Sequence, residues 1–163
     1  MDKFELPADA AFWHPKIAML YRYWRSIHPE GGGLPGRQHF DPTDVPRLLA
    51  NIWLLDVERD PLRFRYRLVG TALERFYGEH ATGRYLGEVN SKYFDPAYFQ
   101  HYALVVNEHA HHYRRGAPTF EPDRRIASRA HVERLLLPLA RDGSTVDTIL
   151  ALTVVLDQAG AEI

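Results

Sequence analysis

Cysteine is absent from this chain of 163 residues. Disulfides, thiolate metal sites, cysteine nucleophiles and chromophores attached through a sulfur atom are therefore excluded. The chain also lacks an apolar run long enough to span a bilayer, and acidic side chains stand in its N-terminal stretch where a signal peptide would be apolar. We therefore expect a cytoplasmic protein.

Neither sign of charge dominates, since 20 basic and 21 acidic residues leave a formal net charge of −1. Such a balance gives no general attraction to nucleic acid or to an anionic membrane, so we expect neither as a partner. Catalytic signatures are missing too: the chain has no Gly-x-Ser-x-Gly, no phosphate-binding loop and no His-Glu-x-x-His. We therefore do not expect an enzyme.

The chain does contain an ordinary globular mixture, 45% apolar and 25% charged, in a length that suits one domain. Its most informative stretch is residues 36–70. Two runs of strand-forming residues, 52–57 and 64–69, are separated there by a charged segment that contains Pro61. This pattern predicts a β-hairpin.

An amphipathic helix is predicted over residues 15–27, because apolar side chains recur there at helical spacing. They are Ile17, Leu20, Tyr21, Trp24 and Ile27. Pro29 and three consecutive glycines end the helix, since neither residue type continues a helical turn. We interpret residues 1–33 as an N-terminal helix followed by a glycine-rich linker, and the aromatic face of this helix packs either on the main domain or on a second copy of the chain.

Further elements follow the hairpin. Helices are predicted over residues 71–77, 83–88 and 96–115, each closed by glycine or proline. Strands are predicted over residues 119–127, 133–139 and 146–156, the last two joined at an Asp142-Gly143 turn. The predicted order is therefore a helix, a linker, two strands, a set of helices and three strands.

Four short sequences stand out within this order. They are Tyr23-Trp24, LPGRQHFDP at residues 34–42, RYRLVGT at residues 65–71 and LLPL at residues 136–139. In these sequences, and in the order of its elements, the chain resembles the stand-alone bacterial PAS family over roughly residues 21–155. Gly78 and Gly83 also resemble the glycines that PAS domains place around their first short helix.

The resemblance implies an α+β fold, a PAS-like five-stranded antiparallel sheet covered on one face by helices and preceded by the N-terminal amphipathic helix. Residues 34–157 would form the PAS-like domain and residues 158–163 a C-terminal tail. The resemblance also implies a sensory or interaction module that signals through a protein partner, because no output domain is recognised after the last strand. Many PAS domains dimerise through a helix before the first strand, so Tyr21, Trp24 and Ile27 are the expected face of a homodimer.

Many PAS domains hold a small molecule between the sheet and its helices, and this implies a pocket here. The expected lining residues are Trp53, Leu54, Tyr66, Leu68, Tyr85, Tyr102, His109, Leu152 and Val154. The pattern leaves open Trp53 against Leu54, and Leu152 against Val154. It does not identify the ligand. A noncovalent flavin could stack on Trp53, Tyr66 and Tyr85, and core packing is the alternative role of these residues.

Histidines gather in the predicted helix 96–115. Only His109 and His112 lie one turn apart, and no carboxylate of matching spacing accompanies them, so we predict no metal site. His109 is the candidate for a haem ligand, because it adjoins Ala110 and lies one turn from Tyr113 on the apolar face. Its alternative role is that of a partly buried histidine that donates to a backbone carbonyl.

Arginines alternate with apolar residues in the strand 64–69. Side chains of a strand point to opposite faces in turn, so Leu68 should join the aromatic residues and Val69 the arginines. Arg67 then lies on the open face, paired with acidic residues of the neighbouring strand or free to meet an acidic partner. If the sheet is turned, Arg67 points into the pocket and binds a carboxylate in bidentate fashion.

Arg37 and Asp41 stand four residues apart before the hairpin. We expect them to hold the chain where it enters the first strand, as an ion pair or a cap. The alternative for Arg37 is a direct contact with a ligand or a signalling partner.

Two other functions compete with that of a ligand-binding sensor. The first is a protein-interaction adaptor whose core is filled and binds no ligand. The second is a small-molecule isomerase or hydratase, which needs a buried acid–base pair facing a cavity. His109 with Glu108 or Asp95 is the pair that the sequence offers, and residues 108 and 109 point about 100° apart on a helix.

Overall fold

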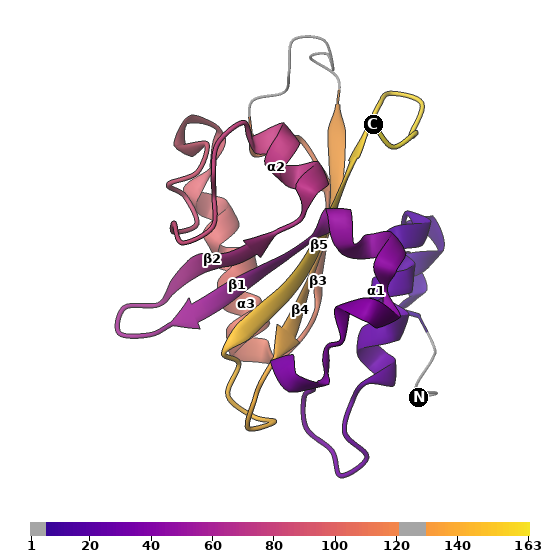
Figure 1. Ribbon diagram of the computed structural model, residues 1–163, viewed down its shortest axis with the longest axis vertical. Coiled ribbons are helices and arrows are strands. Elements are labelled where there is room, and N and C mark those ends of the chain that lie inside the picture. Colours follow the sequence, from indigo (N-terminus) through magenta and orange to yellow (C-terminus); the bar gives the residue numbers. More distant parts are fainter. Residues whose placement is uncertain (1–5, 121–129) are drawn as a thin grey trace.

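The computed structural model describes residues 6–120 and 130–163 and contains a single five-stranded antiparallel sheet (Figure 1). The strands are β1 (Ile52–Glu58), β2 (Arg63–Val69), β3 (His112–Gly116), β4 (His131–Leu139) and β5 (Thr148–Leu156). Their order across the sheet is β2-β1-β5-β4-β3. The predicted α+β class with a five-stranded antiparallel sheet is confirmed.

Helices precede the sheet and connect its second and third strands. The α-helices of the described residues are α1 (Pro15–Ser26), α2 (Thr71–Tyr77) and α3 (Phe99–Glu108). The 3-10 helices are η1 (Ala8–Phe12), η2 (Arg37–His39), η3 (Pro42–Asp44), η4 (Pro46–Asn51), η5 (Ser91–Tyr93) and η6 (Pro96–Tyr98). None of the helices in residues 6–120 and 130–163 has the length and apolar run needed to cross a membrane.

Helices lie on both faces of the sheet, and the central strand β5 is buried at all nine of its positions. α1 packs on β4 and β5 on one face, and α3 packs on β3 and β4 on the other (Figure 1). Leu152 and Val154 of β5 belong to the cluster beneath α1, whereas Ala151 belongs to the cluster beneath α3. A strand buried on both faces is apolar throughout, which is why the sequence leaves its side-chain directions open.

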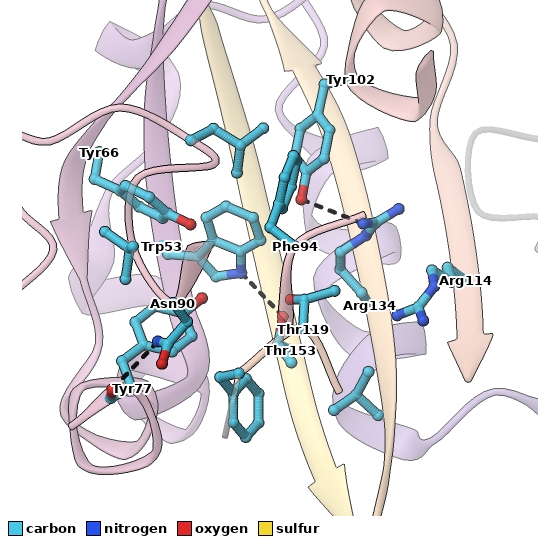
Figure 2. Close-up of a pocket in the computed structure, with 14 residues that line it drawn as sticks. Trp53, Tyr66, Tyr77, Asn90, Phe94, Tyr102, Arg114, Thr119, Arg134 and Thr153 are labelled. Carbon is cyan, nitrogen blue, oxygen red and sulfur yellow. Dashed lines mark hydrogen bonds between the residues drawn. The ribbon is translucent and has the colours of Figure 1, made fainter. Parts of the chain in front are cut away.

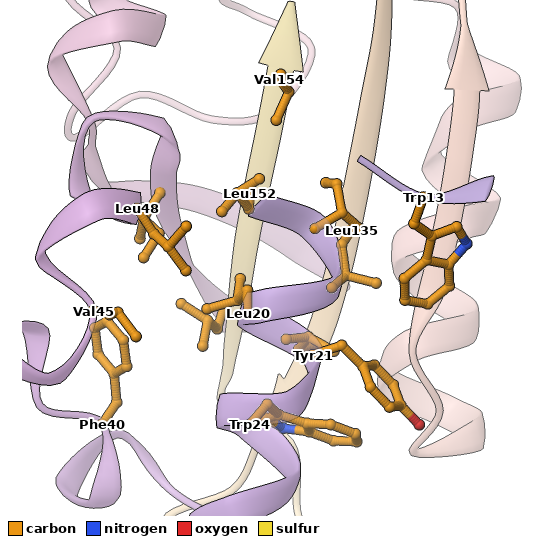
Figure 3. Packing of buried hydrophobic residues seen from close by; sticks show 14 of the residues in the cluster. Trp13, Leu20, Tyr21, Trp24, Phe40, Val45, Leu48, Leu135, Leu152 and Val154 are labelled. Carbon is orange, nitrogen blue, oxygen red and sulfur yellow. The ribbon is translucent and has the colours of Figure 1, made fainter. Parts of the chain in front are cut away.

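The N-terminal helix α1 is part of the core. Tyr21 and Trp24 are only 6% and 4% exposed, and Figure 3 shows them among the buried side chains of the sheet. The indole Nε1 of Trp24 donates a hydrogen bond to the backbone oxygen of Pro138 at 3.0 Å. Ile27 is partly buried against the same cluster. The predicted dimer face is therefore wrong, because this apolar stripe covers the chain's own sheet, and the boundary at residue 33 does not separate two packing units.

The β1–β2 hairpin forms as predicted, with an irregularity in its register. Leu54 pairs with Leu68 and Leu55 pairs with Tyr66, so Arg67 is an extra residue, as in a β-bulge. The extra residue reverses the alternation beyond it. Val69 therefore turns into the core beneath α2 and α3, whereas Leu68 is 46% exposed on the opposite face. The prediction that Leu68 shares a face with Tyr66 is wrong for this reason.

The predicted helix 96–115 is too long at its C-terminal end. α3 ends at Glu108, His109 adopts a left-handed conformation with φ of 54°, and His112–Gly116 forms β3 against β4. Pairing with β4 overrides the helical spacing that extends to Tyr113. In the described part, the strand before β4 is His112–Gly116. Of the strand predicted over residues 119–127, residues 119 and 120 form a bend and residues 121–127 lie outside the described part.

Residues 83–88 form turns along the outer edge of β2 instead of the predicted helical turn. The backbone N–H of Leu86 donates to the oxygen of Phe64 at 2.8 Å, and the N–H of Tyr66 donates to the oxygen of Arg84 at 2.9 Å. These bonds cover an edge whose backbone groups would otherwise lie open.

Candidate functional site

A small cavity lies between the sheet and the layer that contains α2 and α3 (Figure 2). Its volume is about 20 Å³. This is room for about one water-sized group, since roughly 10–15 Å³ by the same measure holds one water molecule. The lining residues are Trp53, Tyr66, Tyr77, Leu86, Val89, Asn90, Phe94, Tyr102, Arg114, Thr119, Phe120, Val132, Arg134 and Thr153.

Aromatic rings form one wall of the cavity. The Trp53 ring centroid lies 5.8 Å from that of Tyr66 and 6.3 Å from that of Tyr102. The indole Nε1 of Trp53 donates to Oγ1 of Thr153 at 3.1 Å, a bond that Figure 2 shows at the cavity. A buried indole needs such a partner, so the hydrogen bond holds the plane of Trp53 in one orientation.

Arg134 of β4 is the charged group at the centre of this site. It is only 4% exposed, and its guanidinium lies 5.0 Å from the centroid of the Tyr102 ring. Its Nη1 donates to the hydroxyl of Tyr102 at 3.2 Å, and its Nη2 lies 3.1 Å from Nδ1 of His101 and 3.3 Å from Nδ1 of His112. Its Nε is buried and has no hydrogen-bond partner. Every partner it has among the described residues is uncharged.

His101 and His112 stack on each other next to Arg134, with ring centroids 4.2 Å apart. Burial, and after it the charge of Arg134, lowers the pKa of His101, and the same causes lower the pKa of His112 to about 4. Both rings are therefore neutral near pH 7. Each Nδ1 accepts from Arg134, so each ring carries its proton on Nε2.

Tyr66, which is buried, and Tyr77, which is half-buried, border the cavity on the side of α2. Burial raises the pKa of Tyr66 well above its ordinary value and raises the pKa of Tyr77 as well. Their hydroxyl groups therefore keep their protons at any physiological pH. Asn90 completes this side, since its Nδ2 donates to the backbone oxygen of Tyr77 at 3.2 Å.

A family model described as a PAS domain matches residues 12–154. The chain belongs to the PAS family. As a PAS domain it is a sensory or interaction module. Among solved structures, it is similar to the structure of an RNA-binding Light-Oxygen-Voltage receptor, with 19% sequence identity and a TM-score of 0.48. The match covers 77% of this chain and 36% of that one, so the PAS domain spans about a third of the receptor's length. No curated protein matches the sequence.

Three of the predicted pocket residues of this PAS domain meet at the cavity: Trp53, Tyr66 and Tyr102. Leu54, Leu152 and Val154 instead belong to the cluster beneath α1. Of Trp53 and Leu54, it is Trp53 that lines the cavity. Neither Leu152 nor Val154 of the last strand faces it. Thr153 between them does so.

Tyr85 lies on the surface of the PAS domain. Its hydroxyl donates to Glu58 at 3.0 Å, and the guanidinium of Arg63 stacks over its ring at 4.4 Å. Tyr85 therefore does not join Trp53 and Tyr66 in a site where a flavin could stack on all three rings. A cavity of about 20 Å³ is also far smaller than the roughly 300–1,000 Å³ of typical ligand pockets.

His109 is exposed at the end of α3 and does not face the cavity. It is therefore not placed as a haem ligand, because the helix ends before it. The acid–base pairs proposed for an enzyme are lost with it. Asp95 instead caps η6, where it accepts from the backbone N–H of Ala97 at 2.9 Å. No group of three or more potential metal ligands occurs in the part of the chain that the structure describes.

Arg67 points to the open face, where its Nη1 lies 3.2 Å from Oδ1 of Asp56 and its side chain is 60% exposed. Arg63 and Arg65 both lie 3.1 Å from Glu58. The outward orientation is thus the observed one, and Arg67 does not bind a carboxylate in the cavity. Arg114 and Arg134 are the arginines that line it.

Arg37 and Asp41 do not pair with each other, but each closes a local turn. Arg37 Nη1 donates to the backbone oxygen of Phe40 at 2.9 Å, and Asp41 Oδ1 accepts from the N–H of Thr43 at 2.9 Å. These capping bonds, and not an ion pair, hold the chain before β1.

Two surface grooves meet at Arg37. An apolar groove of about 330 Å³ is lined by residues of η4, β1 and β2 that include Leu49 and Leu68, which are 39% and 46% exposed. A polar groove of about 440 Å³ is lined by Arg37, Asp56, Val57, Arg65, Arg67, Arg141, Asp147 and Thr148. Together they offer an apolar strip beside an arginine-rich one.

Sequence reasoning missed Arg134, Tyr77 and Thr153. A signal for Arg134 was present, since it is a charged residue inside a strand whose next three residues are all leucine. Charged residues are almost never fully buried unless they are paired, so an arginine in such a strand indicates either an open face or a binding site.

Proposed function

We propose that this PAS domain is a sensor that binds a small molecule in the cavity between the sheet and the α2–α3 layer. The observation that carries the proposal is the buried Nε of Arg134, a donor without an acceptor among the described residues. Leaving a buried donor unsatisfied costs about 1–3 kcal/mol, and more when the group is charged. A bound molecule that supplies the acceptor would remove this cost.

The position of the cavity suggests how binding would be transmitted. Arg134 and Thr153 lie on β4 and β5, the strands whose other face carries α1. Their neighbours Leu135 and Leu152 pack in the cluster beneath that helix. A ligand that binds better to one arrangement of these strands shifts the population toward it and, through the shared strands, changes the packing of α1.

The output of this sensor would pass to a protein partner through the two grooves at Arg37. Their chemistry fits a segment with apolar side chains flanked by acidic ones, because Leu49 and Leu68 lie beside several arginines. A Leu68→Asp variant should keep its stability, since Leu68 is 46% exposed, but should no longer recover such a partner. Homodimer formation stays a prediction.

Native mass spectrometry of freshly purified protein tests the sensor function directly. The sensor predicts an additional mass of ligand size, or a rise in the unfolding temperature on addition of a compound from a metabolite set. Binding should also change the fluorescence of Trp53, and this change should be lost in Trp53→Phe but kept in Trp24→Phe. If no compound binds or stabilises the protein, the sensor proposal fails.

The small size of the cavity favours a second candidate, a protein-interaction adaptor that binds no ligand. A cavity of about 20 Å³ is little larger than the voids that a closely packed protein core contains. The adaptor predicts no bound mass and no stabilisation by metabolites, together with loss of partner binding in Leu68→Asp. The mass and unfolding measurements therefore separate the two functions, whereas loss of partner binding in Leu68→Asp is expected for both.

A further inference from the structure

Two arginines line the cavity, and neither forms a salt bridge among the described residues. Arg134 contacts only neutral side chains. Arg114 donates from Nη2 to the hydroxyl of Tyr98 at 2.9 Å and to the backbone oxygen of Ala117 at 2.6 Å. Each of the six salt bridges formed within residues 6–120 and 130–163 involves other cations. The wall of the cavity therefore carries two positive charges that no carboxylate within residues 6–120 and 130–163 pairs with.

Positive charge dominates the surroundings of the cavity. The side chains that contact Arg134, namely Tyr102, His101 and His112, can accept a hydrogen bond but cannot neutralise its charge at neutral pH. Arg134 and Arg114 both lower the pKa of His101 and of His112, after the larger effect of burial. A buried cation without an opposite charge is costly, because its lost hydration is repaid only in part by neutral acceptors.

Uncharged donors complete the site. Tyr66 and Tyr77 keep their protons, so they offer hydroxyl groups and do not repel an anion. Polar side chains of Asn90, Thr119 and Thr153 also line the cavity, and Phe94, Phe120 and Val132 form the apolar part of its wall. This apolar part can accept a short aliphatic tail. The cavity volume of about 20 Å³ is room for about one water-sized group, so the ligand must be compact, and the side chains around the cavity must move apart to admit one of more than one or two heavy atoms.

We propose that the cavity is an anion site and that the ligand sensed by this PAS domain is a small monocarboxylate, bound through the free Nε–H of Arg134. This inference rests on the sensor function proposed above and adds the chemical class of the ligand. The carboxylate supplies both the missing acceptor and the missing negative charge, and Arg114 contributes the second positive charge. A short aliphatic tail lies against the aromatic wall.

Thermal unfolding with acetate and acetamide tests the charge requirement, because the two compounds have nearly the same shape and differ in charge. Sodium chloride keeps the ionic strength constant in all samples. Near-saturating acetate should raise the unfolding temperature by about 5 °C or more, as expected for a ligand at roughly 100 times its dissociation constant. Acetamide should leave it unchanged. Equal effects of both compounds would overturn the proposal.

Arg134→Met is the decisive variant and Arg67→Met is its matched control, since Arg67 is exposed on the open face. Methionine replaces the buried charge by an apolar chain, a change that proteins often tolerate. Arg67→Met should keep the acetate response and Arg134→Met should lose it. A response of the same size in both variants would show a general salt effect and contradict the site.

A second measurement does not depend on the folding of Arg134→Met. In the unaltered protein, acetate should shift the NMR signals of the His112 ring and the Trp53 indole N–H saturably, and acetamide should not. Unmoved signals overturn the anion site. Glu121 and Asp123 lie outside the described residues and are the chain's own competing carboxylates. The proposal is overturned if the parent protein shows no acetate response and a Glu121→Gln/Asp123→Asn variant loses stability. These two carboxylates, and not a ligand, would then supply the negative charge.

The outcomes for ligand class and for sensor function are distinct. If a neutral compound copurifies with the protein or stabilises it while acetate has no effect, the sensor function stands and the anion site is wrong. If neither neutral compounds nor carboxylates bind, both proposals fail. A carboxylate response that depends on Arg134 supports both.

Discussion

Arg134 on β4 and His112 on the adjacent strand β3 lie 3.3 Å apart, from Nη2 of the guanidinium to Nδ1 of the ring. Because Nδ1 accepts from the arginine, a second ring proton would have to point at a positive charge. Burial and this charge lower the pKa of His112 to about 4. The pair therefore holds His112 neutral over the physiological range.

Acidification should destabilise the fold between about pH 6.5 and about pH 4. The ordinary pKa of His112 is 6.5, so the unfolded chain binds a proton that the folded chain does not accept until about pH 4. The stability that His112 contributes is complete above about pH 6.5 and declines as the pH falls toward about pH 4. Urea unfolding at several pH values measures the decline, to which His101 and His111 add, because their pKa values are lowered too. The decline should be smaller in His112→Asn. An NMR titration of the His112 ring with a midpoint near 6.5 would contradict the prediction.

Thr153→Val should destabilise the protein by about 1–3 kcal/mol, because it leaves the buried indole N–H of Trp53 without its acceptor. Chemical denaturation measures the change. Phenylalanine at position 53 has no such donor, so Thr153→Val should have almost no effect in a Trp53→Phe background. Equal costs in the two backgrounds would show that the hydrogen bond does not stabilise the fold.

Trp24→Ala should cost about 3–5 kcal/mol of folding stability, as expected for removal of a large buried side chain. The indole also donates to the backbone oxygen of Pro138, which would be left unpaired. Arg22→Ala on the exposed side of α1 is the control and should be near neutral. If Trp24→Ala instead left the unfolding free energy intact and only weakened self-association, α1 would be a dimer face after all.

Gly70→Ala should destabilise the protein by about 1–3 kcal/mol through overpacking. A Cβ atom at this position would lie 2.4 Å from the backbone oxygen of Ala50 and 2.5 Å from that of Leu49, neither of which can rotate away. Gly31→Ala is the matched control, because a Cβ there has nothing within 4 Å. Thermal unfolding of the two variants compares them, and equal stabilities would contradict the close approach of η4 to the end of β2.

Local patterns predicted most elements well, and the exceptions have identifiable causes. α2 has its predicted ends, and the β1–β2 hairpin lies within one residue of its predicted position. These segments have strong periodicity and end at glycines or turns. The helix predicted to reach Arg115 failed because β3 forms by pairing with β4, a long-range interaction that leaves no mark on the helical spacing of its residues.

Side-chain directions were harder to predict than elements. The extra residue at Arg67 depends on which residues of β1 lie opposite, and it reverses Leu68 and Val69. Trp53 could be placed at the pocket only as one of two choices, since β1 is buried on both faces over its first four residues. A sequence records that such positions are apolar but not which layer covers them.

The sequence by itself determined the family, the hairpin, the amphipathic helix and the exclusion of thiol chemistry, because each depends on residue type and short-range spacing. Only the tertiary structure decided that α1 covers the second face of the sheet, and that Arg134, which lines the cavity, meets His101, His112 and Tyr102. These residues come from α3, β3 and β4, and their burial follows from the packing of two helical layers on one sheet. The charge of an arginine is a property of the chain, whereas its burial away from water is a property of the fold.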